Sequence, residues 1–281
     1  MNAPFGISEF TTQPLTLEQD LALYGEAGVT FIEVCETKLN RADPQPQLRL
    51  VKESGLAVSS VQPRLHGLFP ELVNAEPKAP SERMAHFRRS IELFGRYFPG
   101  TTLVTISGVA PEANYELAYR TAEKEYKEIA KVAGDHGVRV GLEPLHPVLM
   151  NVGSFICSLA HAGRIIEAVD HPSFGLFLDV WHFWEDPDAT RQIERYGPKI
   201  FGVHVSDWKT PRAFEDRHLP GEGEIPLVPL LRAIRQTGYA GAYTLELFSD
   251  TRLSGSLWVD PRRTVFQGVA VFNNLWQKVC A

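Results

Sequence analysis

The sequence predicts a (β/α)8 TIM barrel that takes up the whole chain, residues 1–281, as one domain. Short apolar runs alternate with helical patterns eight times from end to end, and no low-complexity linker interrupts them. Several helical patterns stop at a glycine just before the next apolar run, where a left-handed helix cap is expected; these are Gly28, Gly55, Gly137 and Gly238. An open doubly wound sheet is the rival fold. It usually carries a Gly-rich phosphate loop after its first strand, and residues 6–14 do not form one.

The first half of the chain supplies four strand and helix pairs. The strands are expected at residues 5–10, 29–35, 56–62 and 101–107, of which the first is the weakest apolar run. The helices are expected at residues 16–27, 44–54, 80–98 and 111–136. The helical period is clearest in the last of these, where the apolar residues of one face are Leu117, Ala118, Ala122, Tyr126, Ile129 and Ala133.

The second half repeats the pattern with strands that are apolar along their whole length, as expected for strands buried on both faces. They are expected at residues 138–143, 174–180, 200–206 and 242–248. The helices are expected at residues 154–169, 188–196, 227–237 and 261–279. Ser154 is a residue type that caps helices, so we expect it to start the first of these helices.

A polar residue lies at or near the end of each of these four strands, and together these residues, the quartet, form a candidate metal site: Glu143, Asp179, His204 and Glu246. Side chains alternate along a strand, and the residue two positions earlier is small in three of the four cases, which leaves room beneath a polar cluster. Active sites of this fold lie at the C-terminal ends of the strands. Each residue alone fits an ordinary polar strand end equally well, but three crowded carboxylates call for a cation. Their mostly oxygen ligands suit Mn²⁺ or Mg²⁺, with Co²⁺ and Zn²⁺ as further candidates.

Loop residues near the quartet are candidates for substrate contacts. His182 follows Asp179 by three residues and is expected to contact a substrate hydroxyl or carbonyl, unless it is a solvated loop histidine. Arg217 is either a fixed cation for substrate oxygens or an ion-pair partner of Asp216. His146 follows Glu143 closely and is a candidate general acid or base.

Weaker candidates are His66, at the end of the third run, and the tryptophans that follow strands. Trp181 and Trp208 are expected to stack on the apolar face of a sugar ring, although packing of the loops explains each of them equally well. The same two interpretations, stacking on a sugar and packing of the loops, apply to Trp184 and Trp258.

Composition excludes several classes of protein. Lys and Arg number 28 against 34 Asp and Glu, and a net charge of -6 argues against nucleic-acid binding. Cys35, Cys157 and Cys280 are too few and too far apart for a disulfide framework. The N-terminus lacks the pattern of a signal peptide, and the apolar stretches are too short to span a bilayer. We therefore expect a cytoplasmic protein without a membrane partner.

Taken together, these motifs resemble the xylose-isomerase-like sugar isomerase/epimerase superfamily along about the whole chain. They are the strand-end glutamates, Asp-x-x-His, His-x-x-Asp and a Pro-Gly-x-Gly loop. The resemblance to its ketose 3-epimerases implies that the quartet holds one divalent metal, often Mn²⁺. It further implies that Glu143 and Glu246 are the acid/base pair and that His182 and Arg217 contact substrate.

Other members of the superfamily suggest alternatives. Residues 141–147, 179–188 and 204–211 look similar to the metal-bearing subunit of C-glycoside deglycosidases, in which a histidine placed like His146 is the catalytic base. That subunit works with a small β-rich partner. Inosose dehydratases and hydroxypyruvate isomerases share the scaffold. Endonuclease IV would use His182, Asp216 and His218 for a third metal, but the fourth run lacks the histidine that its first metal needs.

The expected reaction is removal of a proton next to a carbonyl, through a metal-stabilised enediolate. An isomerase or epimerase is the leading hypothesis, a lyase on a keto-glycoside or inosose-type substrate is the second, and a non-catalytic metal-binding subunit is the third. The expected partner is a small sugar or keto-sugar. No Gly-rich or Lys/Arg cluster marks a phosphate site, which favours a non-phosphorylated one. A homo-oligomer is expected, and the loop at residues 249–260 and the apolar last helix are candidate interface elements.

Overall fold

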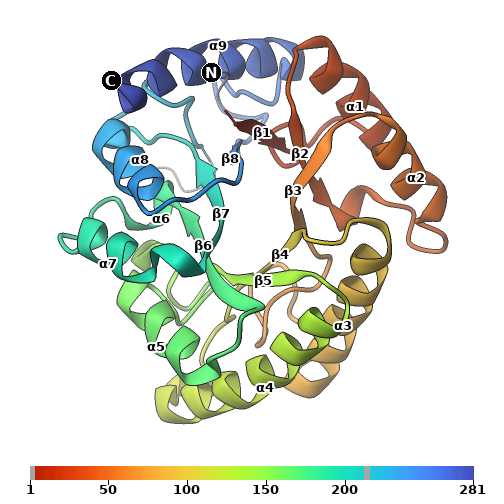
Figure 1. The fold of residues 1–281 in the computed structure, drawn as a ribbon, viewed down its shortest axis with the longest axis vertical. Coiled ribbons are helices and arrows are strands. Elements are labelled where there is room, and N and C mark those ends of the chain that lie inside the picture. Colours follow the sequence, from red (N-terminus) through yellow and green to blue (C-terminus); the bar gives the residue numbers. More distant parts are fainter. Residues whose placement is uncertain (1–3, 212–215) are drawn as a thin grey trace.

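The computed structural model describes residues 4–211 and 216–281, and its strands close into a single barrel. All neighbouring strands are parallel, and their order around the barrel follows the sequence, with β8 returning to β1 (Figure 1). The predicted (β/α)8 fold is therefore confirmed. The strands are β1 (Phe5–Ser8), β2 (Phe31–Cys35), β3 (Ala57–Gln62), β4 (Thr102–Thr105), β5 (Arg139–Leu142), β6 (Phe174–Asp179), β7 (Ile200–Val205) and β8 (Tyr243–Leu245).

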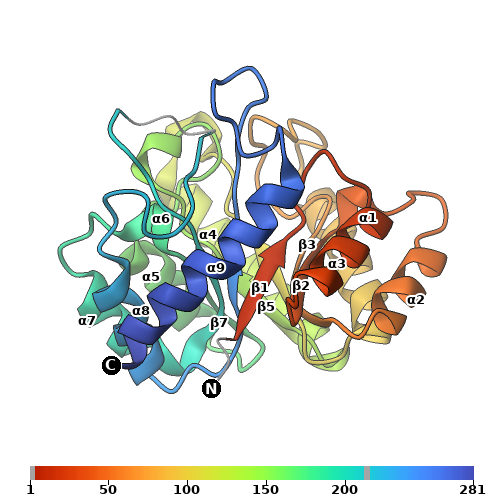
Figure 2. The same cartoon turned by 90° about the horizontal axis from the view of Figure 1, so that it is seen from above.

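Helices surround the barrel, and Figure 2 shows them from a second direction. The principal helices are α1 (Leu17–Glu26), α2 (Gln45–Glu53), α3 (Pro80–Tyr97), α4 (Tyr115–Asp135), α5 (Leu159–Val169), α7 (Ala189–Tyr196), α8 (Leu227–Gln236) and α9 (Pro261–Cys280). The short helix α6 (Val180–Phe183) follows β6 directly and was not expected from the sequence. Single 3₁₀ turns complete the elements: η1 (Glu36–Lys38), η2 (Pro111–Ala113), η3 (Pro147–Leu149) and η4 (Gly197–Lys199).

The glycines expected at the helix ends have the backbone conformation that the prediction required. Their φ angles are positive, at 70° for Gly28, 82° for Gly55, 66° for Gly137 and 86° for Gly238. A side chain is strained in this region, so glycine ends the helix and turns the chain toward the next strand. This local chemistry sets the helix ends close to their predicted positions.

Two predicted helix starts were wrong. Ser158, not Ser154, caps α5, because its hydroxyl accepts a hydrogen bond from the backbone N–H of His161 at 3.1 Å. Ser154 is buried and its Oγ lies 2.7 Å from the Oγ of Ser107, which ties the loop after β5 to the loop after β4. The helix α4 begins after Asn114, whose side chain caps it, and not at residue 111.

The barrel interior is filled below its C-terminal mouth by Phe177. A Cβ at Gly202 would lie 2.1 Å from this ring, and a Cβ at Gly141 would lie 2.9 Å from the Phe177 Cβ. The ring also packs against His204, with 4.5 Å between the ring centroids. The sequence suggested that the small strand residues leave empty space under the polar cluster, and this interpretation was wrong. They make room for one phenylalanine that supports it.

The outward side chains of the same strands pack against the helices. Leu142, Leu178, Val203 and Leu245 are all buried in the hydrophobic core between the strands and the surrounding helices, as the alternation of side chains predicts. Among the helices of the described residues, none is long and apolar enough to cross a membrane. The three cysteines are free, and Cys35 and Cys157 are buried.

Candidate metal centre and active site

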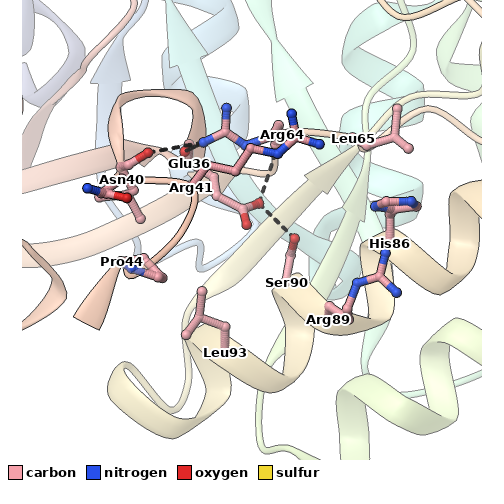
Figure 3. A pocket seen from close by; sticks show the side chains of 11 residues that line it. Glu36, Asn40, Arg41, Pro44, Arg64, Leu65, His86, Arg89, Ser90 and Leu93 are labelled. Atoms are coloured by element: carbon pink, nitrogen blue, oxygen red, sulfur yellow. Dashed lines mark hydrogen bonds between the residues drawn. The ribbon is translucent and has the colours of Figure 1, made fainter. Parts of the chain in front are cut away.

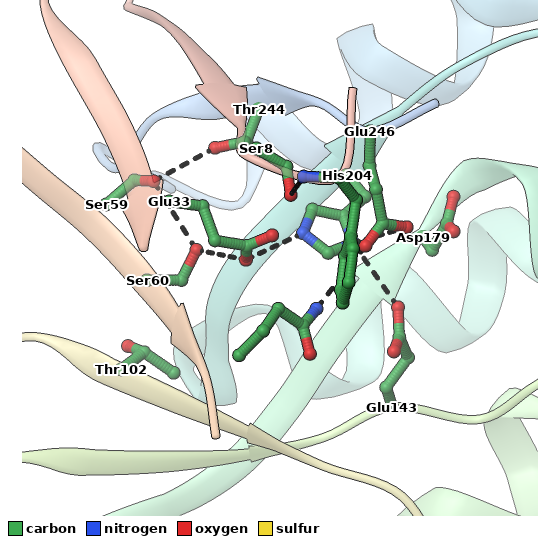
Figure 4. Close-up of polar contacts among 12 residues, drawn as sticks. Ser8, Glu33, Ser59, Ser60, Thr102, Glu143, Asp179, His204, Thr244 and Glu246 are labelled. Carbon is green, nitrogen blue, oxygen red and sulfur yellow. Dashed lines mark hydrogen bonds and ion pairs between the residues drawn. The ribbon is translucent and has the colours of Figure 1, made fainter. Parts of the chain in front are cut away.

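The four predicted ligands meet at the C-terminal mouth of the barrel. Each offers one ligand atom, and these atoms lie within 4.8 Å of one another, with all four side chains buried (Figure 4). We call Glu143, Asp179, His204 and Glu246 the quartet. The strand register helps to align them, because Asp179 on β6 pairs directly with His204 on β7. Among the described residues, the quartet is the one group of three or more such side chains with this geometry.

Two atoms of the quartet are left without hydrogen bonds in a way that fits a bound cation. Glu143 Oε1 and His204 Nδ1 are buried, lie 3.4 Å apart and have no hydrogen-bond partner in the described chain. His204 Nδ1 also lies 3.3 Å from Glu246 Oε2. Buried polar atoms normally have a partner, and a metal ion between these three side chains would supply one.

The second nitrogen of His204 is held by a residue that the sequence analysis missed. Glu33 on β2 is fully buried, and its Oε2 lies 2.8 Å from His204 Nε2. Ser60 Oγ donates a hydrogen bond to the same carboxylate at 2.6 Å. Burial lowers the pKa of His204, but Glu246 and Glu33 outweigh it and raise that pKa well above its usual value. With Nε2 held by the Glu33 carboxylate, a bound metal would replace the proton on Nδ1, the nitrogen that faces Glu143 and Glu246. Such an outer carboxylate commonly orients a metal-bound histidine.

The charges of the site have opposite effects on its carboxylates. Burial, together with Glu246 and Asp179, raises the pKa of Glu143 to about 7 despite the opposing effect of His204. Burial would also raise the pKa of Asp179, but Arg217, His182 and His204 outweigh it and lower that pKa to about 2. Asp179 is thus a permanent anion, whereas Glu143 exchanges a proton near neutral pH.

Arg217 points into the site. Its Nη1 donates hydrogen bonds to Asp179 Oδ2 at 2.7 Å and to Glu246 Oε2 at 3.0 Å. Its backbone N–H donates to the carbonyl of Phe248 at 2.9 Å, which fixes the loop at this point. The guanidinium also lies over the Trp181 ring, 4.9 Å from its centroid. Of the two interpretations of Arg217, the inward one agrees with its position.

His182 is buried beside Arg217 and is not a solvated loop residue. Its Nε2 lies 3.4 Å from both Arg217 Nη2 and Asp179 Oδ2. Desolvation lowers its pKa to about 3 and outweighs the effect of Asp179, so the ring is neutral at physiological pH. A neutral imidazole can donate or accept a hydrogen bond without adding charge to the site.

His146 lies next to the tryptophans rather than in the quartet. Its ring centroid is 5.8 Å from that of Trp181 and 5.3 Å from that of Trp208. Its Nδ1 accepts the Val148 N–H at 3.0 Å, and its Nε2 lies 3.0 Å from Glu185 Oε2. The ring therefore carries its proton on Nε2, where it donates to Glu185.

Trp184 extends this cluster, with its ring centroid 5.2 Å from that of Trp208. We call His146, Trp181, Trp184 and Trp208 the aromatic group. His66 lies elsewhere and its Nδ1 contacts the carbonyl of Pro63 at 2.9 Å. Trp258 also lies apart, and its indole donates to the Phe10 carbonyl.

A family model described as "Xylose isomerase-like TIM barrel" matches residues 21–275. The chain belongs to this family. An inosose isomerase of Bacillus velezensis is 28% identical over 256 residues, which cover 85% of each chain. An L-ribulose-5-phosphate 3-epimerase of Salmonella heidelberg is 26% identical, with 82% of each chain covered. A 3-dehydroshikimate dehydratase of Pseudomonas putida is 27% identical over 84% of this chain, which spans only 36% of that longer enzyme.

Two solved structures share this fold. A protein from Sinorhizobium meliloti superposes with a TM-score of 0.85 at 24% identity, covering 97% of this chain and 98% of the other. The IolI protein, whose structure is described as containing a zinc atom, superposes with a TM-score of 0.74 at 21% identity, covering 98% of this chain and 97% of the other. At these identities the likeness concerns the fold.

The aspartate of the His-x-x-Asp motif, Asp207, has a structural role that the sequence did not show. Asp207 accepts backbone hydrogen bonds from Gly221, Gly223 and Ile225, at 2.8 to 3.0 Å. A Cβ at Gly223 would lie 2.4 Å from Asp207 Oδ1. Asp207 therefore fixes the Pro-Gly-x-Gly loop, and glycine is required for the loop to approach so closely.

The set of residues that resembles the third metal site of endonuclease IV does not form a cluster. His182 contacts Asp179 and Arg217, whereas His218 Nε2 lies 4.0 Å from Asp216 Oδ2. Within residues 4–211 and 216–281, these side chains do not meet the geometry of a second metal site.

Proposed function

We propose that this protein is a divalent-metal-dependent sugar isomerase or epimerase that removes a proton next to a carbonyl group. The observation that carries the proposal is the buried quartet, in which two glutamates from the ends of non-adjacent strands, β5 and β8, both lie within 3.4 Å of His204 Nδ1. The names of two relatives, an inosose isomerase and an L-ribulose-5-phosphate 3-epimerase, support the same class of reaction.

The quartet would hold the metal, with Mn²⁺ as our first choice given its three carboxylates and one imidazole. The zinc in the IolI structure supports a divalent ion in this family, while the identity of the ion here stays a prediction. When bound, the ion polarises the substrate carbonyl and acidifies the neighbouring C–H.

Glu143 and Glu246 would move the proton. Burial raises the pKa of the Glu143 carboxyl in the metal-free site, which favours its use as a base toward the substrate C–H, and a bound cation would lower that pKa. Glu246 approaches from β8 and would act on the opposite face of the planar intermediate. Two groups on opposite faces are what an inversion at one carbon requires.

Arg217 and His182 would bind and orient the substrate oxygens. Arg217 Nε and His182 Nδ1 are buried without a hydrogen-bond partner in the described chain, so they are donors or acceptors that a sugar hydroxyl can satisfy. Trp181 and Trp208 offer ring faces for the apolar side of a sugar. His66, in the loop after β3, stays a predicted substrate contact.

A lyase is the second candidate, and the pairing of His146 with Glu185 is the observation that favours it. An elimination needs an acid for its leaving group in addition to the base that removes the α-proton. The Nε2 proton of His146, which Glu185 accepts in the structure, would supply it. The name of the 3-dehydroshikimate dehydratase agrees with such an outcome.

One experiment separates these candidates. The purified protein, loaded with Mn²⁺, is incubated in D₂O with a panel of ketoses, inososes and keto-glycosides, and the products are followed by NMR. Deuterium at an inverted carbon supports the epimerase, and loss of water or aglycone supports the lyase. Glu246→Gln should abolish exchange. If no substrate of the panel exchanges, or if metal-free protein is fully active, the proposed function is wrong.

The remaining expectations follow from this proposal. The substrate would be a small sugar or keto-sugar, and the protein would act in the cytoplasm as a homo-oligomer. A small β-rich partner subunit belongs to the deglycosidase alternative alone.

A further inference from the structure

A cavity of about 340 Å³ lies outside the barrel, between α3 and the loops that follow β2 and β3. This volume is at the lower end of the range for small-molecule sites. Figure 3 shows His86, Arg89, Ser90 and Leu93 projecting from α3 toward the loops that carry Glu36 and Arg64. The residues that line the cavity belong neither to the quartet nor to the aromatic group.

The cavity is positively charged although the protein as a whole carries -6. Its described lining contains the guanidinium groups of Arg41, Arg64 and Arg89, against the single carboxylate of Glu36. The arginines come from three segments: the loop after η1, the loop after β3 and the helix α3. Because they are distant in sequence, no basic cluster is visible in the chain itself.

One side of the cavity is rigidly built. The Oε2 of Glu36 accepts hydrogen bonds from the Arg64 N–H at 2.9 Å and from Ser90 Oγ at 2.7 Å. Arg64 Nη2 donates to the carbonyl groups of Glu36 and Leu39, at 2.7 and 3.1 Å. The guanidinium of Arg64 is therefore fixed before any ligand arrives, and the carboxylate of Glu36 already has donors. Such preorganisation lowers the entropy that a ligand must lose on binding.

The other two guanidinium groups have no counter-ion within residues 4–211 and 216–281. Arg41 and Arg89 are exposed, and neither forms an ion pair with any residue that the structure describes. Burial lowers the pKa of the neighbouring His86, and the positive charges of Arg89 and Arg41 lower it further. Guanidinium groups that line one cavity and outnumber its carboxylates attract an anion.

We propose that this cavity binds a small phosphorylated metabolite, with its phosphate on Arg41, Arg64 and Arg89. The planar fork of arginine matches phosphate oxygens in paired hydrogen bonds, which lysine does not reproduce. The remaining lining is half apolar, and its apolar part fits a short carbon skeleton attached to the phosphate; the apolar residues are Leu39, Pro44, Leu65 and Leu93. This site is separate from the sugar site proposed above.

The cavity is joined to the metal centre through two short stretches of backbone. Glu36 lies three residues after Glu33, which holds His204. Arg64 lies two residues after Gln62, whose Nε2 donates to Glu246 Oε1 at 3.4 Å. A ligand on these loops would thus contact the segments that support the quartet.

Calorimetric titration of the full chain tests the proposal, with inorganic phosphate, glycerol 3-phosphate and malonate as probes. Ionic strength is held constant with sodium chloride, so that general screening does not imitate binding. We expect saturable binding of one phosphate per chain and tighter binding of glycerol 3-phosphate, because it also meets the apolar lining. Binding of malonate as tight as that of glycerol 3-phosphate, or no saturable heat with either phosphate, would overturn the assignment.

Variants locate the site. The double variant Arg41→Ala/Arg89→Ala should weaken phosphate binding by roughly 10-fold or more, since two charged donors are lost. Arg89→Lys keeps the charge but should still bind more weakly than wild type. Arg96→Ala, on the same helix but outside the cavity, is the matched control and should keep wild-type affinity. Wild-type affinity in the double variant contradicts the proposal.

Two further measurements keep the result interpretable. Circular dichroism and thermal unfolding in phosphate-free buffer check that the variants fold, which is expected because Arg41 and Arg89 are exposed. Arg217→Gln, which removes the guanidinium group of the barrel mouth, should bind glycerol 3-phosphate as wild type does. Loss of binding in that variant would place the phosphate in the barrel mouth and refute a separate cavity, whatever the outcome of the D₂O experiment.

Discussion

Glu33→Gln should weaken metal binding although Glu33 is not one of the four predicted metal ligands. In the native protein the carboxylate of Glu33 accepts the Nε2 proton of His204 at 2.8 Å, inside a fully buried environment. Glutamine has the same shape but no charge. It can accept the same proton only through its amide oxygen, and only if Ser60 accommodates the amide group.

The size of the effect follows from this contact. Hydrogen bonds to a charged partner contribute about 1.5–3 kcal/mol, and neutral ones about 1 kcal/mol. The substitution therefore costs roughly 1–2 kcal/mol, which corresponds to about 5- to 30-fold in the dissociation constant. If the glutamine turns its NH₂ group toward Nε2, the proton of His204 moves to Nδ1, and the loss will be at the upper end of this range.

The assay is a titration of chelator-treated protein with Mn²⁺, in which free Mn²⁺ is measured by its electron paramagnetic resonance signal. Glu9→Gln is the matched control, because Glu9 is also buried at the strand ends but binds the Cys35 N–H, at 2.7 Å. Its affinity for Mn²⁺ should equal that of wild type. A Glu33→Gln dissociation constant within twofold of wild type would refute the reasoning about His204.

Four other outcomes test the site and the fold. Removal of metal by a chelator should abolish turnover and Mn²⁺ should restore it; activity that survives complete removal contradicts the metal assignment. Glu246→Gln should lower kcat by about 10²-fold or more while the protein stays folded, since one acid/base group is lost, and near-normal kcat would exclude that role. His146→Ala should suppress an elimination but leave proton exchange at the α-carbon, and equal losses of both would argue against a leaving-group acid. Phe177→Ala should lower the free energy of unfolding by about 3–5 kcal/mol in urea, whereas Phe266→Ala, at a 39% exposed position, should cost far less; similar losses would contradict the central packing of Phe177.

The quartet was predictable because its signal is local. Each ligand directly follows a continuous apolar run, and the period of two along a strand shows which face it shares. Glu33 carried a similar signal, as the single acid inside the apolar run at 29–35, but it does not end that run. Its contact with His204 joins residues 171 positions apart, so only the closed barrel reveals it.

Other features depended on contacts that periodicity does not describe. The helix α6 has four residues, which is about one turn and too short to show a helical period. Ser154 and Ser158 are equally good caps by residue type, and the bond of Ser154 with Ser107 decides between them. By residue type Phe177 is the one large residue among the four that precede the ligands by two positions, and its ring is the reason that its neighbours on β5 and β7 are glycines.

The ring of Phe177 also limits how the site can be reached. The ring fills the barrel below His204, so a cation, a substrate and water would all reach the quartet through the C-terminal mouth. Arg217 Nη1 reaches Asp179 and Glu246 directly, so a sugar bound to Arg217 would lie over a cation held by the quartet, and we expect the cation to bind before the sugar. A bound sugar should therefore slow the release of the cation. A chelator would extract the cation more slowly from the protein with sugar bound than from the protein without it.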